Sequence, residues 1–433
     1  MPTTPTPPTG TRPTRSLFSL LAEKDFRRLF TGKAASMVGT EVGHLAIPLL
    51  ALSQLDASPG QVGLLAALAT AAFLLIGLPA GVWVDAMRRR TVLIAADLVR
   101  ALVLASIPVA WALGVLTIEQ LYVCVLLNGM ATVFFDVGAQ SYLPFIVGRD
   151  DLVRANALVV GVDAVGSIGG RGVGGFLVQY LGGPLVVLVN SVCYFWSALW
   201  IALIRRREPA PQPRSGVGLL PQIREGVRFV FGHRLLRPIA FSATAMNFSI
   251  QFVLIMMPVM VINELGMGEG VVGLFFAAGG VGILLGSLTA ERVAAVLGHG
   301  RSLWISSAVT APFVVLVPLV DEGVLLWAAC GGWLVAAYRL GVHNVVQVSF
   351  RQHVTPGPLL GRMNATMRFL FTGVLALGAA ASGALAEVTD VRTALWVGAV
   401  GIAVSWLPMY FSPLRGMRHL PEPDPHPGHP NRS

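Results

Sequence analysis

Charged side chains are scarce in this chain of 433 residues. Asp, Glu, Lys and Arg together make up 12% of it, whereas 55% is hydrophobic and the mean hydropathy is +0.71. Such values lie far outside the usual composition of soluble domains. Because a helix that crosses a bilayer needs about 20 mostly apolar residues, the chain has room for about twelve such helices. The composition therefore predicts a membrane protein and excludes a separate catalytic domain.

Cysteines and the motifs of several function classes are also scarce or missing. Cys124, Cys193 and Cys330 each lie inside an apolar run, without the spacing of a disulfide or a metal site. The sequence contains no phosphate-binding Gly-Lys-Ser/Thr loop, no cluster of metal ligands and no nucleophile–base signature. These absences argue against redox chemistry, ATP-driven pumping and catalysis. We expect no enzyme and no cofactor, with a membrane enzyme or a non-transporting receptor as an alternative.

Apolar runs bounded by charge, Pro or Gly predict the order of the helices. Six spans are expected near residues 30–54, 60–84, 91–114, 118–146, 156–179 and 183–204, and six more near 238–263, 268–291, 302–320, 324–349, 365–387 and 391–412. The predicted fold is an all-α integral membrane protein with six-helix bundles at 26–204 and 238–412. Residues 205–237 connect them, and the stretch from Leu219 to Leu236 reads as an amphipathic helix at the membrane surface. Residues 1–25 and 413–433 are expected to be disordered cytoplasmic arms.

The positions of the charges predict how the helices cross the membrane. If the amino terminus is cytoplasmic, the outer loops contain only one of the 31 basic residues, Arg392, together with the acidic residues Asp56, Glu119, Glu264, Glu269, Asp321, Glu322, Glu387 and Asp390. The inner loops then hold most of the arginines, as the bias of cytoplasmic loops toward Lys and Arg requires. Both termini are therefore expected inside. Because this bias accounts for the net charge of +9, we expect a lipid bilayer rather than nucleic acid as partner.

An internal repeat relates the two halves. The segment from Ser141 to Ala157 recurs from Ser349 to Ala365, with five shared positions that are all offset by 208 residues. The same offset carries Gly175 onto Gly383. This pattern predicts a duplicated six-helix unit, which is the parallel-repeat plan of one class of transporters.

A motif between the second and third predicted helices is more specific. It reads Gly81-Val-Trp-Val-Asp85-Ala-Met-Arg88-Arg89-Arg90 and continues as Ile94-Ala-Ala-Asp97-Leu-Val-Arg100. From about residue 26 to residue 406 the chain resembles the major facilitator superfamily, in its branch of macrolide-efflux and siderophore-export proteins. The resemblance implies export by proton antiport across a bacterial cytoplasmic membrane, possible multidrug or macrolide resistance, and a monomer.

The same resemblance implies a conformational latch made of Gly81, Asp85, Arg89, Asp97 and Arg100. A glycine permits close helix approach, and the charged groups can pair at a helix end. The alternative is simple positive-inside anchoring, with Asp97 and Arg100 as a static pair.

Ionisable side chains within the predicted spans are candidate sites, because a charge at membrane depth costs about 2.5 kcal/mol or more unless it faces a cavity or a partner. Glu41, with His44 one turn later, is the best candidate for a proton carrier, since a protonated carboxyl is neutral and can exchange its proton when access changes. Asp136 and Asp163 are further candidates for proton coupling. Each of these residues can instead be a paired structural group.

Candidate cargo contacts lie in both halves. Arg171 interrupts the glycine-rich run Gly166-Ser-Ile-Gly169-Gly170-Arg171-Gly172-Val-Gly174-Gly175, where related exporters usually have Pro. Guanidinium groups bind carboxylates and phosphates through paired donors, so deep arginines favour an anionic or zwitterionic cargo. The proposed cargo set is completed by Glu41, His44, Asn247, Gln251, Arg339 and His343. Met257, Phe275 and Phe276 can line an apolar pocket or merely pack helices.

The sequence thus favours a proton-driven exporter of a drug-like or natural-product small molecule. A lipid or lysophospholipid translocator would use the same fold, with the arginines binding phosphate. An importer is a further alternative, because the direction of transport depends on coupling rather than on any one motif.

Overall fold

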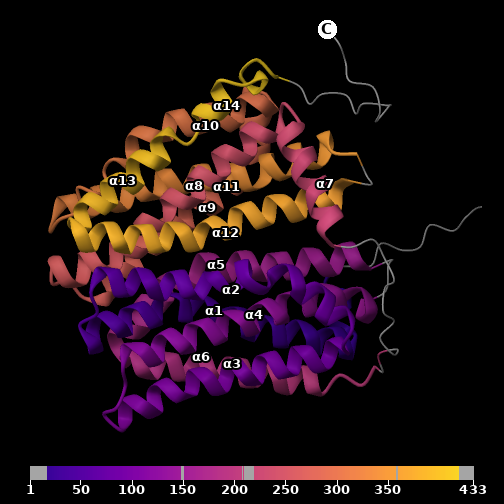
Figure 1. The fold of residues 1–433 in the computed structure, drawn as a ribbon, viewed down its shortest axis with the longest axis vertical. Helices are drawn as coiled ribbons and strands as arrows, with labels where there is room; N and C mark the ends of the chain where they lie inside the picture. Colours follow the sequence, from indigo (N-terminus) through magenta and orange to yellow (C-terminus); the bar gives the residue numbers. More distant parts are fainter. Residues whose placement is uncertain (1–16, 148–150, 207, 209–218, 357–358, 419–433) are drawn as a thin grey trace, which may run out of the picture.

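The computed structural model describes residues 17–147, 151–206, 208, 219–356 and 359–418, and its regular structure is helical throughout these ranges (Figure 1). The first half contains α1 (Lys24–Leu55), α2 (Pro59–Asp85), α3 (Arg89–Ala112), α4 (Ile118–Val147), α5 (Leu152–Leu181) and α6 (Gly183–Ala202). The second contains α8 (Leu236–Val259), α9 (Glu269–Leu297), α10 (His299–Val314), α11 (Val324–Val354), α12 (Leu360–Val388) and α13 (Val391–Val404). Short helices occur at Leu17–Ala22, Met260–Glu264, α14 (Leu407–Tyr410) and Pro413–Arg415.

All twelve predicted spans are present in the described part of the chain. Ten of them are long and apolar enough to cross a membrane by length and composition alone, and α5 and α10 complete the fold. Several helices extend beyond the predicted bounds: α1 starts at Lys24 rather than near 30, and α11 ends at Val354 rather than near 349. Hydropathy detects only the part of a helix that lies in hydrocarbon, whereas the backbone hydrogen bonds continue into charged turns.

The two halves lie side by side and contact each other through two equivalent helix pairs, α2 with α12 and α5 with α9 (Figure 1). In the first pair, a Cβ placed on Gly63 would lie 2.5 Å from the Cα of Gly383. In the second, a Cβ on Gly175 would lie 2.6 Å from the Cα of Gly273. Gly175 and Gly383 are the glycines that the 208-residue repeat relates, so they occupy corresponding places in the two contacts. Only residues without side chains permit this approach.

The bundle has two chemically different ends. We call the end where α1 terminates and α2 begins the acidic end, because it holds Asp56, Glu269 and Glu387. The opposite end, where α1 begins and α6 terminates, is the basic end. The basic residue at the acidic end, Arg392, donates to the carbonyl oxygens of Pro318 and Val320 at 3.1 and 3.2 Å.

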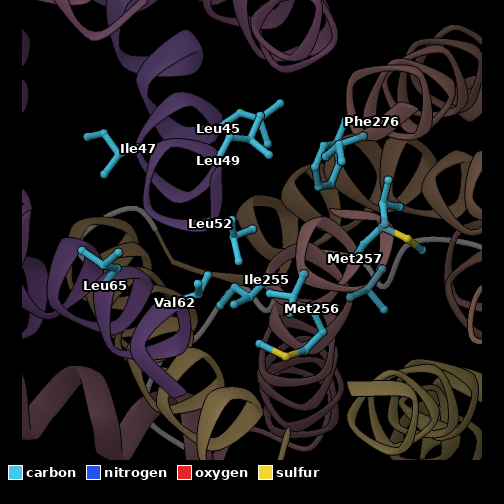
Figure 2. Close-up of a cluster of buried hydrophobic side chains, with 14 of the residues drawn as sticks. Leu45, Ile47, Leu49, Leu52, Val62, Leu65, Ile255, Met256, Met257 and Phe276 are labelled. Carbon is cyan, nitrogen blue, oxygen red and sulfur yellow. The ribbon is translucent and has the colours of Figure 1, made fainter. Parts of the chain in front are cut away.

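Apolar packing joins the two halves at the acidic end, whereas at the basic end each half has apolar clusters of its own. One large core cluster includes residues of α1, α2, α8 and α9, and Figure 2 shows Leu52, Val62 and Ile255 from this cluster converging across the boundary. At the basic end the clusters each stay within one half: one surrounds Phe26 and Tyr142, another surrounds Phe350. The halves are therefore sealed by hydrophobic contact at the acidic end.

Helix α7 (Leu219–Gly232) runs across the basic ends of the second-half helices (Figure 1). It packs on α12, where Arg362 pairs with Glu225 at 2.5 Å, and Val230 is buried. The predicted helix to Leu236 was too long, because a turn at 233–235 separates α7 from α8. In that turn the Nδ1 atom of His233 accepts the backbone N–H groups of Leu235 and Leu236. Burial lowers the pKa of His233, which favours the neutral ring that can accept these bonds.

Candidate transport site

A cavity of about 1040 Å³ lies between the two halves. It extends from the level of Val62 and Pro258, near the acidic-end seal, to Lys33 near the basic end. Leu45, Leu65 and Phe276, which Figure 2 shows among the buried side chains of the core cluster, also line this cavity. The seal closes the cavity toward the acidic end, so the cavity lies on the basic side of the hydrophobic contact.

The two walls of this cavity differ in chemistry. The first half contributes the ionisable lining residues Lys33, Glu41, His44, Arg100 and Asp136. The described lining of the second half is apolar or neutral, and consists of Gln251, Leu254, Ile255, Pro258, Phe276, Ile283, Leu284, Ser287, Asn344, Val345, Thr372 and Leu375. A bound molecule would therefore meet charged groups on one side and an apolar surface on the other.

Glu41 is buried in this wall, with 7% of its surface exposed. It lies opposite the glycine-rich run of α5: a Cβ on Gly170 would lie 2.5 Å from the Cβ of Glu41. The glycine run therefore leaves the space that this carboxylate occupies. His44, one turn later on α1, also lines the cavity and is exposed to it.

Polar and aromatic contacts link α1, α3, α4 and α6 beside the cavity. The Thr40 hydroxyl bonds the hydroxyl of Tyr194 at 3.0 Å. The guanidinium carbon of Arg100 lies 4.2 Å from the centroid of the Tyr194 ring and 4.3 Å from that of the Phe135 ring. Arg100 is 1% exposed and forms an ion pair with Asp97 one turn before it. The predicted carrier Glu41 and Arg100 of the predicted latch therefore both belong to the first-half lining of the cavity.

The other latch residues lie at the basic end. Arg89 pairs with Glu208 at 3.2 Å, and the second carboxylate oxygen of Glu208 accepts the backbone N–H of Arg90 at the start of α3. Gly81 and Asp85 lie in the last turns of α2, but their side-chain positions are outside the described residues. Asp97 and Arg100 pair within the first half, and Arg89 pairs with Glu208 of the connector, so the latch function remains a prediction.

The structure divides the predicted cargo set between two places. Glu41, His44 and Gln251 line the central cavity, and the Gln251 amide donates to the Leu375 carbonyl oxygen at 3.4 Å. Asn247, Arg339 and His343 instead line a second cavity of about 160 Å³ inside the second half. The side chains of Arg171 and Asp163 lie outside the described residues, although both positions are within α5.

The aromatic and methionine residues of the second half that were candidates for an apolar pocket also lie in two different places. Phe276 lines the central cavity, whereas Met257 and Phe275 are buried in the core. The Phe275 ring stacks on Trp333 with centroids 5.3 Å apart. One of the three residues thus lines the cavity, and the other two pack between helices.

Several residues of this region were missed by sequence reasoning. Lys33 and Tyr194 line the cavity, and Glu208 holds the start of α3. Asn190 of α6 fills a notch in α1: its side chain lies where a Cβ of Gly39 or Gly43 would otherwise be. The spacing of Gly39 and Gly43, one turn apart, was the signal for such a notch, but nothing in the sequence identified its occupant.

Comparison with solved structures defines the fold. A bacterial homologue of the iron transporter ferroportin in an inward-facing state superposes with a TM-score of 0.70 at 16% identity, covering 91% of this chain and 98% of that chain. A structure of such a homologue in an outward-facing state gives a TM-score of 0.57 at 15% identity, over 89% and 98% of the two chains. The chain therefore has the fold of these structures, with twelve helices in two halves, as predicted.

The family is shown by the sequence itself. The chain belongs to the transmembrane secretion effector family, whose sequence profile matches residues 15–429. Among its relatives is the enterobactin exporter of Citrobacter koseri, which is 26% identical over 410 residues, covering 93% of this chain and 94% of the relative. The predicted resemblance to the siderophore-exporting branch of the major facilitators is therefore confirmed.

Proposed function

We propose that this chain exports a small natural product, of the siderophore or drug-like class, across a bacterial cytoplasmic membrane by proton antiport. Its similarity to an enterobactin exporter supports export of a siderophore-like cargo. The volume of the central cavity, at about 1040 Å³, supports a cargo at the upper end of the range of about 300–1,000 Å³ found for small-molecule pockets.

The observation that carries the proposal is the difference between the two cavity walls. An amphipathic cargo with acidic or hydrogen-bonding groups fits between Lys33 and His44 on one side and the apolar residues around Phe276 on the other. The ammonium group of lysine attracts anionic oxygens, and the apolar residues favour burial of the rest of the molecule. An anionic or zwitterionic natural product satisfies both surfaces.

Alternating access follows from the asymmetric closure of the bundle. With the basic end in the cytoplasm, as the Lys and Arg bias indicates, the seal at Gly63 and Gly383 closes the outer side. The higher TM-score to an inward-facing than to an outward-facing structure supports the same assignment. Export then requires rocking of the halves that separates these glycine contacts and brings the basic ends together.

Proton coupling is assigned to Glu41, with Asp136 as a second carboxyl in the same wall. A protonated Glu41 is neutral and is tolerated beside Gly170 in a closed, low-dielectric site, whereas the carboxylate needs water or a cation. Release of this proton to the cytoplasm restores the Glu41 carboxylate, and binding of the cargo changes the environment of that carboxylate. One site thereby links the proton to the conformational cycle.

Reconstituted transport tests this proposal. The purified chain is placed in liposomes with an acidic lumen, and accumulation of enterobactin, a macrolide and a cationic dye is measured. We expect gradient-dependent accumulation of at least the siderophore, and its loss when nigericin collapses the gradient. Accumulation of the whole panel at the rate of protein-free liposomes would refute the proposed cargo class. Gradient-independent movement of a labelled phospholipid between leaflets would instead identify a lipid translocator.

A further inference from the structure

The smaller cavity in the second half has an unusual lining. It lies between the basic-end halves of α8, α11 and α12, and it is lined by Ser242, Ala243, Met246, Asn247, Arg339, Leu340, His343, Asn344, Gln347, Val348, Arg351 and Phe371. Among the described residues, this lining contains two arginines and no carboxylate. It therefore concentrates positive charge inside a bundle whose surroundings are apolar.

Arg339 is fixed at the wall of this cavity. Its guanidinium, 2% exposed, donates to the carbonyl oxygen of Ile402 at 3.0 Å and to the Ser405 hydroxyl at 2.7 Å. Both acceptors are neutral, and a guanidinium carries five N–H donors. Arg339 is thus held in place by α13 while its charge is not neutralised by these contacts.

Arg351 is nine-tenths buried and lines the same cavity about three turns further toward the basic end of α11, on the helix face that also holds Asn344 and Gln347. Its guanidinium lies 5.4 Å from the ring of Phe371, and its Nε atom has no hydrogen-bond partner among the described residues. A buried donor without an acceptor is destabilising, and more so when it is charged. The cavity therefore contains a cationic donor without a protein acceptor for its Nε–H.

Neutral polar groups surround the two cations. The Asn247 amide donates to the Ala243 carbonyl at 3.0 Å, which leaves its remaining polar atoms available to the cavity. Asn344 and Gln347 add further amide donors from α11. The Nε2 atom of His343 is bonded to Ser307 and Leu303, so this ring is already engaged by α10.

We propose that this cavity binds a small oxyanion, such as sulfate, phosphate or a small carboxylate, at Arg351. Guanidinium groups donate to such oxygens in pairs, and the amides of Asn247 and Gln347 supply neutral donors. At about 160 Å³ the cavity accepts such an ion with water but is smaller than pockets for drug-sized molecules, which start at about 300 Å³. The inference is independent of the cargo and of proton coupling.

The site adjoins the transport pathway. Asn344 lines both cavities, so an anion bound beside it lies directly behind the wall of the central cavity. Occupation of the small cavity would offset the charge of Arg351 behind that wall. The anion is thus a structural ligand of the second half rather than the transported molecule.

Binding of radiolabelled sulfate to the purified full chain in phosphatidylcholine nanodiscs tests the site. We expect saturable binding in the wild type, a dissociation constant at least about tenfold higher in Arg351→Gln, and unchanged binding in Arg362→Gln. Arg362 is a matched control, because it lies at the same end but pairs with Glu225 outside the cavity. A second variant, Asn247→Asp, places a carboxylate in the cavity and is expected to abolish sulfate binding by supplying the anion internally.

The outcomes separate the sources of the anion. Competition by free phosphate and by acetate in these nanodiscs supports a free-ion site, whereas displacement of sulfate only when phosphatidylglycerol is added identifies a lipid headgroup as the oxyanion source. Absence of saturable sulfate binding in the wild type, in both the presence and absence of anionic lipid, would overturn the proposal. Equal affinity of the wild type, Arg351→Gln and Asn247→Asp would also overturn it.

Discussion

At the scale of single residues, Arg100 is fixed by more interactions than an exposed ion pair provides. Its guanidinium lies between the rings of Phe135 and Tyr194 and pairs with Asp97, with both charged groups buried. Cation–π contacts of this kind are worth about 2 kcal/mol when desolvated. The arrangement fixes α3 against α4 and α6 beside the central cavity.

Replacing Arg100 by Gln should therefore destabilise the protein strongly, because Asp97 would remain buried without its partner. We expect a loss of about 3 kcal/mol or more in unfolding free energy, measured by denaturant unfolding in detergent. The double variant Asp97→Asn with Arg100→Gln should lose less than the single one. Arg28→Gln is the matched control: Arg28 pairs with Asp25 at the same spacing but is only partly buried, so its loss should cost clearly less than the loss of Arg100. Equal effects of the two single variants would contradict this account.

Some of these residues could be predicted from the sequence and others could not. Glu41 is recognisable because a carboxylate in an apolar run must face a cavity or a partner. Arg339 is recognisable in the same way, but its acceptors on α13, Ile402 and Ser405, lie more than sixty residues further along the chain. Only the fold reveals that Ile402 and Ser405 lie at the end of this side chain and that Arg339 lines the smaller cavity.

At the scale of helices, contacts between glycines determine how closely the halves approach. Gly175→Val should hold the acidic end open, because a side chain there collides with the backbone of Gly273. Overpacking costs about 1–3 kcal/mol, so the open population should rise roughly tenfold. Spin labels at Leu113 and Val388, which are 71% and 78% exposed at the acidic ends of the two halves, report the separation in a background without native cysteines.

Gly161→Val is the control for that experiment. Gly161 lies on the same helix, but a Cβ at this position meets nothing within 4 Å. Its distance distribution should match that of the unsubstituted chain. A Gly175→Val distribution without a longer component would show that the glycine contact does not limit closure.

The turn between α7 and α8 should be sensitive to acid. Because burial lowers the pKa of His233 below its ordinary value of 6.5, the unfolded turn takes up a proton first as the pH falls. The stability that the neutral ring contributes is present above pH 6.5 and is lost as the pH falls through the lower folded-state pKa. Hydrogen exchange of the Leu235 and Leu236 amides, corrected for intrinsic rates, should accelerate between pH 7 and pH 5. His233→Asn, which retains an acceptor, should remove this acceleration; an unchanged response would refute it.

The positions of the helices were predictable because the thickness of the bilayer sets the length of each hydrophobic segment. The ends of the helices were less predictable. Helices α1 and α11 continue into charged turns, and α7 stops at Gly232 because the His233 ring accepts backbone N–H groups at the start of the next helix. Such ends depend on individual hydrogen bonds. Hydropathy averages over a window and does not resolve them.

At the scale of the whole molecule, the duplicated plan was visible in the repeat, whereas the conformation was not. The repeat places Gly175 and Gly383 in equivalent contacts, but it is silent on which end is closed. That information lies in the continuous core at the acidic end and in the separate cores around Phe26 and Phe350. Both arrangements of the halves satisfy the same sequence, since a transporter must adopt each in turn.

Orientation in the membrane provides another prediction at this scale. The Lys and Arg bias predicts that both termini are cytoplasmic, and the acidic end is then outside. Fusions of green fluorescent protein to the carboxyl terminus should fluoresce, while alkaline phosphatase should be active only when it is inserted at an acidic-end loop such as that around Asp321. Active phosphatase at the carboxyl terminus would reverse the assignment of inward and outward sides.

The central claim is that the Glu41 carboxyl links a proton to cargo movement, and one comparison tests it most directly. In proteoliposomes, Glu41→Gln should lose accumulation driven by a pH gradient while retaining exchange of labelled for unlabelled cargo, because the neutral amide mimics the protonated carboxyl but cannot release a proton. His44→Gln, one turn away in the same cavity wall, should retain gradient-driven accumulation. Accumulation by Glu41→Gln at the wild-type rate would contradict the account.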